Sequence, residues 1–221
     1  MTPAPTRLGE PGGSGRWAGV PADERRAERR RLLLDAALDL VGTGGADAVT
    51  VRAVCKAARL NPRYFYESFA DRGELLVGLY DDVAAALGAV VAERLSVAPD
   101  DLAEAARIGI DTVFRFAAED PRRAKVLYVE ALTDEALARR RLDAVDAFIA
   151  ALARGRVADD DEGAATSGPR APAIDVVAAS MFTGGVEEIL TGWLGGRIDL
   201  TLDEVVDAAV ALAHRILLPP A

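Results

Sequence analysis

The sequence predicts an all-α fold of about nine helices. Apolar residues recur along most of the chain at the i, i+3/i+4, i+7 spacing that gives a helix one buried face. Capping residues, glycines and Asn-Pro or Asp-Pro pairs separate these stretches, whereas the alternating pattern of a β-strand is almost absent. Of the 221 residues 51% are apolar, which is enough for a buried core and excludes a wholly disordered chain.

The first helix is expected over residues 23–43. One face of it is apolar, and the glycines that end it are Gly42, Gly44 and Gly45. Residues 1–22, which are rich in Pro, Gly and Ser, are predicted to form a disordered tail. They lack the apolar core of a signal peptide, so a cytoplasmic protein is expected.

Two short helices should follow, joined by a tight turn. Thr50 is a suitable N-cap for a helix over residues 51–58. Asn61 and Pro62 then start a helix over residues 62–68, because Asn caps well and proline fits the first helical position. Two short helices with such a turn are typical of a helix-turn-helix, whose second helix lies in the DNA major groove.

Beyond this pair, Asp71 and Glu74 have the spacing of a capping box and predict the start of a long fourth helix. The acidic, Gly- and Pro-containing segment 156–172 is predicted to be a flexible loop. The remaining predicted helices cover residues 100–118, 121–132, 134–155, 173–194 and 202–218. In the helix over residues 134–155 the residues expected to face inward are Leu142, Val145, Phe148, Ile149 and Leu152.

Charge is distributed unevenly along the chain, whose formal net charge is −9. Residues 1–75 contain 12 Arg/Lys and 10 Asp/Glu, whereas residues 76–221 contain 14 and 25. Residues 49–66 contain no acid, and their basic side chains are Arg52, Lys56, Arg59 and Arg63. A second basic cluster over residues 25–31 is either a solvated helix end or a supporting phosphate contact. This asymmetry favours a DNA-binding head on an acidic body.

Several classes of protein are disfavoured. Cys55 is the only cysteine, so no internal disulfide is possible, and we interpret it as a structural thiol rather than a redox sensor. His214 is the only histidine and has no cluster of carboxylates near it in sequence, so neither a metal site nor a cofactor is expected. No uninterrupted apolar run approaches the ~18 residues of a membrane span. A catalytic constellation is hard to assemble from these residues.

A longer resemblance sharpens the prediction. The segment LLDAALDLV at residues 33–41 is followed by Gly45, Thr50-Val51, Leu60-Asn61, Phe65-Tyr66, Phe69, Asp71-Arg72 and Leu75-Leu76. Over residues 30–80 this pattern resembles the N-terminal domain of the tetracycline-repressor (TetR) family. In that family the helical body binds a small molecule and the last two helices form the dimer interface. The resemblance therefore implies a DNA-binding domain over residues 23–72 and a ligand-binding and dimerisation body over residues 73–221.

The resemblance implies phosphate contacts for Thr50, Tyr66 and Arg72 and a base contact for Arg52. Arg63 is the best candidate for base recognition, because a guanidinium can pair with guanine through two hydrogen bonds. Phe65 and Phe69 are expected in the core. The expected DNA-binding residues are Thr50, Arg52, Asn61, Pro62, Arg63, Tyr64, Tyr66 and Arg72.

The sequence departs from the family at five positions, at one of which Arg72 replaces the more usual Lys and keeps the charge. Arg59 stands where glycine is usual, which costs on the order of 1 kcal/mol if its backbone is left-handed. Asn61 replaces a Ser or Thr cap, Ser68 replaces a frequent His or Tyr, and Gly73 replaces a frequent Glu.

In the body, the resemblance suggests an effector pocket, and the low aromatic content favours a modest aliphatic one. The candidate pocket residues are Phe114, Tyr128, Phe148, Met181 and Trp193. Small and apolar residues on the last two helices suggest a four-helix interface between two copies. The candidate dimer residues are Val177, Met181, Gly185, Ile189, Val205, Ala209, Leu212 and Ile216.

The predicted function is a regulator, more specifically a repressor, that binds double-stranded DNA as a homodimer. Two recognition helices ~34–36 Å apart would contact the half-sites of a palindrome. A small-molecule effector, unknown from the sequence, would release it. The alternatives are a helical protein-interaction module without DNA binding and an enzyme.

Overall fold

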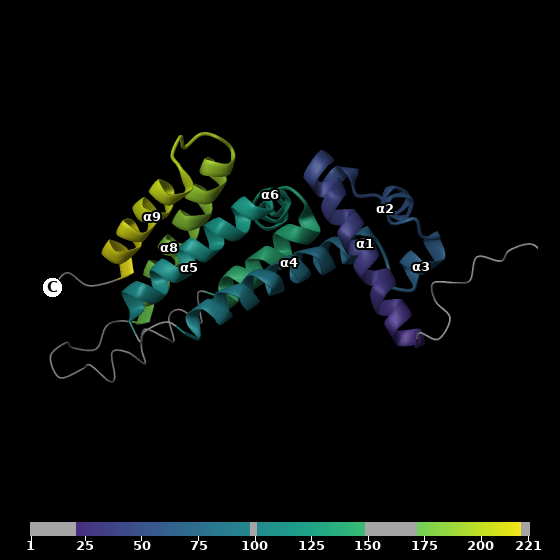
Figure 1. The fold of residues 1–221 in the computed structure, drawn as a ribbon, viewed down its shortest axis with the longest axis horizontal. Helices are drawn as coiled ribbons and strands as arrows, with labels where there is room; N and C mark the ends of the chain where they lie inside the picture. Colours follow the sequence, from purple (N-terminus) through teal and green to yellow (C-terminus); the bar gives the residue numbers. More distant parts are fainter. Residues whose placement is uncertain (1–20, 98–100, 149–171, 218–221) are drawn as a thin grey trace, which may run out of the picture.

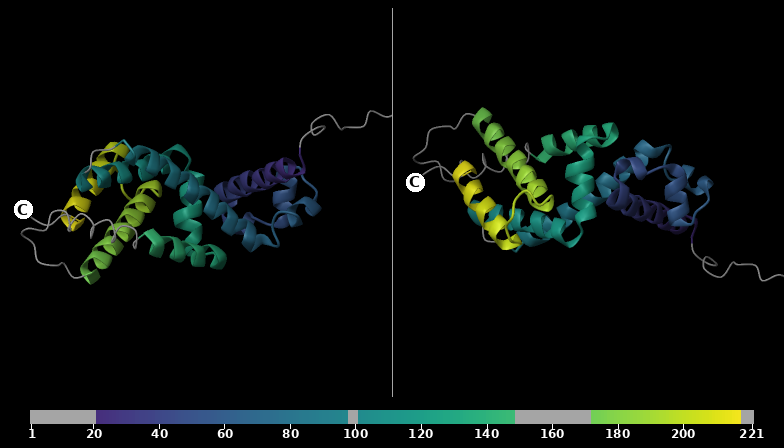
Figure 2. Two further views of the ribbon diagram at one scale, coloured as in Figure 1. Left: turned by 90° about the horizontal axis from the view of Figure 1, so that it is seen from below. Right: turned by 90° about the horizontal axis from the view of Figure 1, so that it is seen from above.

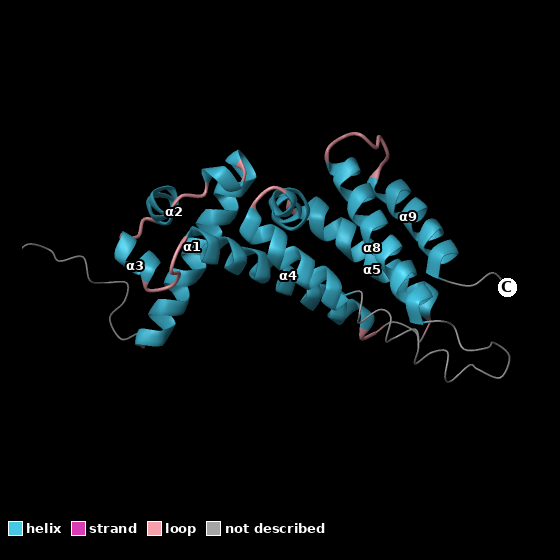
Figure 3. Ribbon diagram, turned by 180° about the vertical axis from the view of Figure 1, so that it is seen from behind, coloured by secondary structure: helices cyan, strands magenta, loops and turns pink. Residues whose placement is uncertain are grey.

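The computed structural model describes residues 21–97, 101–148 and 172–217. All regular structure in these ranges is helical, as Figure 3 shows, which confirms the predicted all-α class. The predicted tail and loop lie almost wholly outside the described residues. Within them only residues 21, 22 and 172 are described, and two of these, Ala22 and Pro172, are already helical.

The head is built from three helices and a tight turn. Helix α1 (Ala22–Gly44) packs against α2 (Val51–Ala58) and α3 (Pro62–Tyr66). Helix α1 ends at Gly45, whose φ of 73° favours glycine and whose N–H donates to the Val41 carbonyl. A 3-10 turn that was not predicted, η1 (Ala46–Ala48), separates α1 from α2.

Helix α4 (Arg72–Leu95) connects the head to the body and is the long diagonal helix of Figure 1. Its start confirms the expected cap: the Asp71 carboxylate accepts from the Glu74 N–H at 2.9 Å. The Ala70 N–H donates in return to the Glu74 carboxylate at 2.5 Å. These reciprocal bonds fix the direction in which α4 leaves the head.

By length and composition alone, α4 is the one described helix that could cross a membrane, with a mean hydropathy of 1.8 over 18 residues. Its first half is a core helix, in which Leu75, Leu76 and Leu79 are buried among head residues. The core helix of a globular protein meets the same criterion, so length and composition alone are weak evidence for a membrane span.

The body contains α5 (Leu102–Glu119), α8 (Pro172–Leu194) and α9 (Leu202–Leu217), with a further helix over residues 135–148. Helix α5 packs against both α4 and α9, and α8 packs against α9. Figure 2 shows α8 crossing the body, so that α8 and α9 lie at the end of the molecule opposite α3.

The segment predicted as one helix over residues 121–132 begins and ends as predicted but changes its winding twice. It consists of α6 (Pro121–Ala124), a π-helical turn η2 (Lys125–Val129) and a 3-10 turn η3 (Glu130–Leu132). A π turn is wider than an α turn, so it changes which side chains face the core.

Two hydrophobic cores result. The head core joins α1, α2, α3 and the first half of α4, with Val126 and Leu127 of η2 added from the body. The second core joins α5, α8 and α9 around Phe114 and Leu190. Tyr128 packs against both cores, so the π-helical turn is where they meet.

Helix 135–148 departs from the predicted packing. Leu142 and Phe148 were expected to face inward, but their residues are 57% and 48% exposed. Their apolar positions therefore lie on an outer face of the protomer. Ile149 and Leu152, expected on the same face, lie outside the described residues.

Candidate nucleic-acid interface

Local capping positions the helix-turn-helix. The Thr50 hydroxyl accepts from the Ala53 N–H at 3.2 Å, and the Asn61 side chain accepts from the Arg63 N–H at 2.9 Å. Pro62 occupies the first turn of α3. Between the two helices Arg59 has φ 55° and ψ 39°, which is the left-handed conformation that the usual glycine would adopt without strain.

The two helices bury their apolar residues and present polar ones. Phe65 and Phe69 are 0% and 1% exposed, which confirms their assignment to the core. Tyr66 is 61% exposed and Tyr64 37% exposed, and the Arg63 side chain is 83% exposed. Thr50, Arg52, Asn61 and Pro62 are also exposed, so seven of the eight predicted DNA-binding residues are accessible to DNA.

Arg72, the eighth, is placed differently from expectation. Its Nε and Nη2 donate to the carbonyls of Val49 and Ala46 at 2.9 and 2.8 Å, and its Nη1 donates to Asp134 at 2.9 Å. Two of these bonds therefore join the start of α4 to the segment around η1 in the head, and the third joins it to Asp134 at the start of helix 135–148. A phosphate contact stays a prediction that would have to use the remaining N–H groups.

The basic cluster on α1 is also largely engaged within the protein. Arg30 donates to the Ser68 carbonyl at 3.1 Å and lies over the Phe69 ring, and Arg31 bonds Glu28 and Asp35. Arg29 lies over Tyr64 and faces Glu67. These three arginines brace helices, so the basic surface is smaller than the sequence suggests.

Sequence reasoning passed over Asp134 and Glu67. Asp134 is 62 residues from Arg72, and no local pattern connects them. The i, i+4 spacing of Arg63 and Glu67 was visible in the sequence and would have identified their 3.1 Å bond.

Cys55 is 5% exposed in the head core, and this burial raises the pKa of its thiol. A buried thiol with a raised pKa forms little thiolate and reacts slowly. This supports a structural thiol.

The five candidate pocket residues do not form one group. Phe114 is fully buried and its ring centroid lies 6.1 Å from that of Trp193, whose Nε1 donates to the Leu200 carbonyl at 2.9 Å. Tyr128 lies between the cores, and burial raises the pKa of its phenol. Phe148 and Met181, which are 48% and 61% exposed, lie on outer faces and do not line an enclosed space in the protomer.

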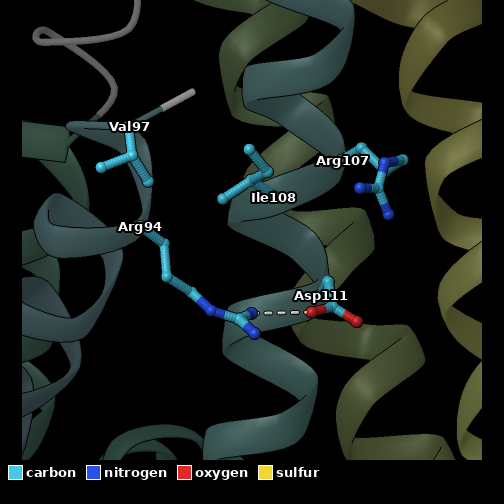
Figure 4. Close-up of a pocket in the computed structure, with 5 residues that line it drawn as sticks. All are labelled: Arg94, Val97, Arg107, Ile108 and Asp111. Carbon is cyan, nitrogen blue, oxygen red and sulfur yellow. Dashed lines mark hydrogen bonds and ion pairs between the residues drawn. The ribbon is translucent and has the colours of Figure 1, made fainter. Parts of the chain in front are cut away.

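A pocket of about 260 Å³ lies between the end of α4 and the first half of α5, and Figure 4 shows the side chains that line it. It is lined by Arg94, Val97, Arg107, Ile108 and Asp111, and Arg94 bonds Asp111 across it at 2.7 Å. None of the predicted pocket residues lines it. Its own arginine and carboxylate pair with each other, which leaves little there for a ligand.

The candidate dimer residues divide into two sets. On α8, Val177, Met181 and Gly185 are exposed, and the first two are 57% and 61% exposed. On α9, Val205 and Ala209 are 1% and 3% exposed because they pack in the protomer's own second core, so assigning them to an interface was wrong.

The other candidates fall between these sets. Leu212 is 47% exposed on the outer side of α9, whereas Ile189 and Ile216 are partly buried against the second core. Among the candidate dimer residues, the exposed ones therefore lie mainly on α8.

An exposed helix pair presenting arginine and tyrosine, carried on a larger helical body, defines a helix-turn-helix DNA-binding regulator. Residues 33–79 match the model of the bacterial regulatory proteins of the tetR family. The chain therefore carries the DNA-binding domain of the tetR family of transcriptional regulators. The family is non-enzymatic, so the enzyme alternative is set aside, and DNA binding replaces the alternative of a pure interaction module.

Solved structures share the fold over nearly their whole length. A regulator from Syntrophomonas wolfei has a TM-score of 0.73 at 17% identity, covering 88% of this chain and 97% of that one. The fatty acid degradation regulator FadR of Bacillus halodurans has a TM-score of 0.72 at 18% identity, covering 87% and 97%. FadR of Bacillus subtilis, in complex with stearoyl-CoA, has a TM-score of 0.69 at 17% identity, covering 83% and 96%. No curated protein matches significantly in sequence.

Proposed function

We propose that this regulator is a repressor that binds a palindromic operator as a homodimer and is released by a small-molecule effector. Residues 23–72 would bind DNA, residues 73–221 would regulate and dimerise, and the protein would act in the bacterial cytoplasm. The observation that carries the proposal is α3 itself. It is capped at its start, anchored by Phe65, and presents Arg63 and Tyr64 outward in a segment without acids.

The dimer would form through α8. Its exposed face combines apolar and small residues and carries no charged side chain between residues 176 and 185. The residues of this face are Val176, Val177, Ser180, Met181, Gly184 and Gly185. A Cβ added to either glycine would meet no atom of the protomer within 4 Å, so these glycines are not needed for packing within it. Small residues permit close approach of a second helix, which supports a symmetric pair of α8 helices as the interface centre.

The effector would bind in the body near Tyr128, where polar groups remain unpaired. Arg141 bonds Glu187, but its Nε and the Thr183 hydroxyl are buried without a partner among the described residues. The described Ser180 and Thr191 on the same helix instead bond carbonyls of their own helix. Buried polar groups of this kind are usually satisfied by water or a ligand. The Bacillus subtilis relative is in complex with stearoyl-CoA, so acyl-CoA is the first effector class to test.

The test of DNA binding is selection of duplexes from a random pool, followed by affinity measurement over a range of salt. We expect an inverted repeat to be enriched, and Arg63→Ala to weaken its binding by ~1–3 kcal/mol and relax the base preference at one position. The matched control is Arg139→Ala, which removes an exposed arginine from a similar i, i+4 pair on the body. Adding stearoyl-CoA to the complex tests the effector.

Failure to enrich any duplex would contradict the proposed function, provided that mass spectrometry of the denatured protein finds no co-purified effector. Equal losses for Arg63→Ala and Arg139→Ala would contradict the assignment of α3 as the base-recognising helix.

A further inference from the structure

The acid-free segment 49–66 is followed immediately by a carboxylate, Glu67, that the fold brings back onto it. Glu67 caps the C-terminus of α3 and accepts a hydrogen bond from the Nε of Arg63 at 3.1 Å. Its other oxygen lies 3.4 Å from the Nη2 of Arg29 on α1. One carboxylate is therefore shared between an arginine of the recognition helix and an arginine of the supporting helix.

Arg29 is a fixed partner in this arrangement. Its side chain is only 19% exposed, and its guanidinium carbon lies 4.6 Å from the centroid of the Tyr64 ring. A guanidinium over an aromatic face is held by the ring's electrons as well as by its ion pair. Arg29 thus braces Tyr64 and Glu67 together, and through Glu67 it braces Arg63.

The bond to Glu67 leaves the tip of Arg63 available. The bond to Glu67 uses the Nε of Arg63. The two terminal nitrogens, Nη1 and Nη2, have no hydrogen-bond partner among the described residues. A bidentate contact with guanine needs two donors on one edge of the guanidinium, and the pair of terminal nitrogens supplies one such edge. Glu67 therefore holds the side chain at its base and directs its end outward.

Glu67 also changes the charge that DNA meets. Non-specific binding to DNA comes from phosphates neutralised by Lys and Arg, whatever the base sequence. A carboxylate beside Arg63 opposes that attraction and leaves hydrogen bonds to bases available. We propose that Glu67, buttressed by Arg29, is a positioning residue that sets the sequence selectivity of Arg63. This inference rests on the proposed DNA-binding function.

The test compares Glu67→Gln with wild type on two duplexes: one selected by the wild-type protein from a random pool, and the same duplex with the selected positions scrambled. We expect tighter binding to the scrambled duplex, with a salt slope steeper by about 0.9, the value of one added phosphate contact. Over about 50 to 200 mM salt this is roughly a threefold additional loss of affinity. The ratio of the affinities for the selected and the scrambled duplex should fall roughly fivefold or more. A roughly fivefold fall corresponds to the low end of the base discrimination that one bidentate contact provides.

The matched control is Glu135→Gln, which makes the same substitution in an exposed i, i+4 pair with Arg139 on the body. It should leave both affinities and the salt slope unchanged. The Arg63–Glu67 pair is exposed and contributes little to stability, and glutamine keeps an oxygen that can accept from Arg29, so the melting temperature of Glu67→Gln should stay close to that of wild type. If Glu67→Gln does unfold α3, Arg29→Lys, which keeps the charge but loses the planar guanidinium over Tyr64, provides the second variant, and it should also lower the selectivity.

The decisive measurement is a double-mutant cycle with Arg63→Ala. If Glu67 acts through Arg63, Glu67→Gln should have no effect on selectivity once Arg63 is alanine. The proposal is overturned if the effect persists there, if Glu135→Gln produces the same change, or if Glu67→Gln weakens binding to both duplexes equally. Failure of the proposed function has a different signature, since the wild-type protein would then select no duplex at all.

Discussion

At the scale of single residues, Arg59 is the position where the fold departs from the conformation its residue prefers. Among the described residues it is the non-glycine residue with positive φ. Two backbone bonds close the turn between α2 and α3: the Arg59 N–H donates to the Lys56 carbonyl, and the Leu60 N–H donates to the Cys55 carbonyl. The turn is held by these bonds and by the cap of α3. The strain is thus borne by the surrounding structure.

Replacing Arg59 with glycine should therefore stabilise the protein. Glycine adopts the left-handed region without the Cβ clash, so we expect Arg59→Gly to raise the free energy of unfolding by about 1 kcal/mol, reduced by the greater entropy of the unfolded chain. Urea denaturation measures this change in the free energy of unfolding. Arg52→Gly, in the first turn of α2, should have the opposite sign and destabilise by up to about 1 kcal/mol. A loss of stability in Arg59→Gly would show that the side chain, rather than the backbone, matters at this turn.

At the scale of elements, the junction between head and body depends on a few polar contacts. Arg72 at the start of α4 bonds Ala46, Val49 and Asp134, and the Ala46 N–H donates to Glu130 of η3 at 2.8 Å. A Cβ at Gly45 would lie 3.1 Å from the Glu130 carboxylate. The absence of a side chain at Gly45 therefore allows η1 and η3 to approach closely. The orientation of the helix-turn-helix relative to the body is therefore fixed at η1.

Removing the Arg72 guanidinium should loosen this junction. Arg72→Met keeps the apolar stem but leaves Asp134, whose side chain is 11% exposed, without its ion pair. We expect a loss of about 2 kcal/mol in the free energy of unfolding and faster amide exchange at Ala46. Arg139→Met, which breaks an exposed pair, should lose less than about 0.5 kcal/mol. Equal stability of the two variants would contradict a structural role for Arg72.

The elements differ in how far the sequence predicts them. The bounds of α2 agree residue for residue, because Thr50 determines its start and the turn after Ala58 its end through local contacts. The winding of residues 121–132 was not predictable, because periodicity cannot locate one π turn whose cause is packing between two cores.

The same limit applies to partners of helices and side chains. The apolar stripe of α9 predicted burial correctly, but periodicity does not say whether the partner is α5 of the same chain or a second copy. Bonds such as Arg72 to Asp134 and Arg29 to Glu67 join residues 62 and 38 positions apart, and only the fold brings them together. Composition therefore overstated the number of arginines free to contact DNA.

At the scale of the whole molecule, α3 and α8 lie at opposite ends (Figure 1). Pairing two copies through α8 would therefore leave both recognition helices exposed at the outer ends of the dimer. A single α3 of five residues can bury little surface on DNA. Linking two of them makes the second contact intramolecular, which raises overall affinity by 10²–10⁴ in comparable bivalent systems, where ~10² is the conservative expectation.

The dimer is tested by placing a charge on the exposed face of α8. Met181 is 61% exposed, so Met181→Arg should leave the protomer folded, whereas two arginines facing each other across a symmetric interface would have to be desolvated. We expect sedimentation to show a monomer and the affinity for the selected duplex to fall by about 10² or more, because half-site binding loses its linkage. Leu132→Arg is the matched control: Leu132 is 64% exposed on η3, and its variant should remain a dimer with unchanged DNA affinity. A monomeric wild-type protein would contradict the proposed homodimer. A Met181→Arg variant that stays dimeric would place the interface elsewhere, and the contact between copies would then have to be sought on the exposed apolar side of helix 135–148, where Leu142 and Phe148 lie.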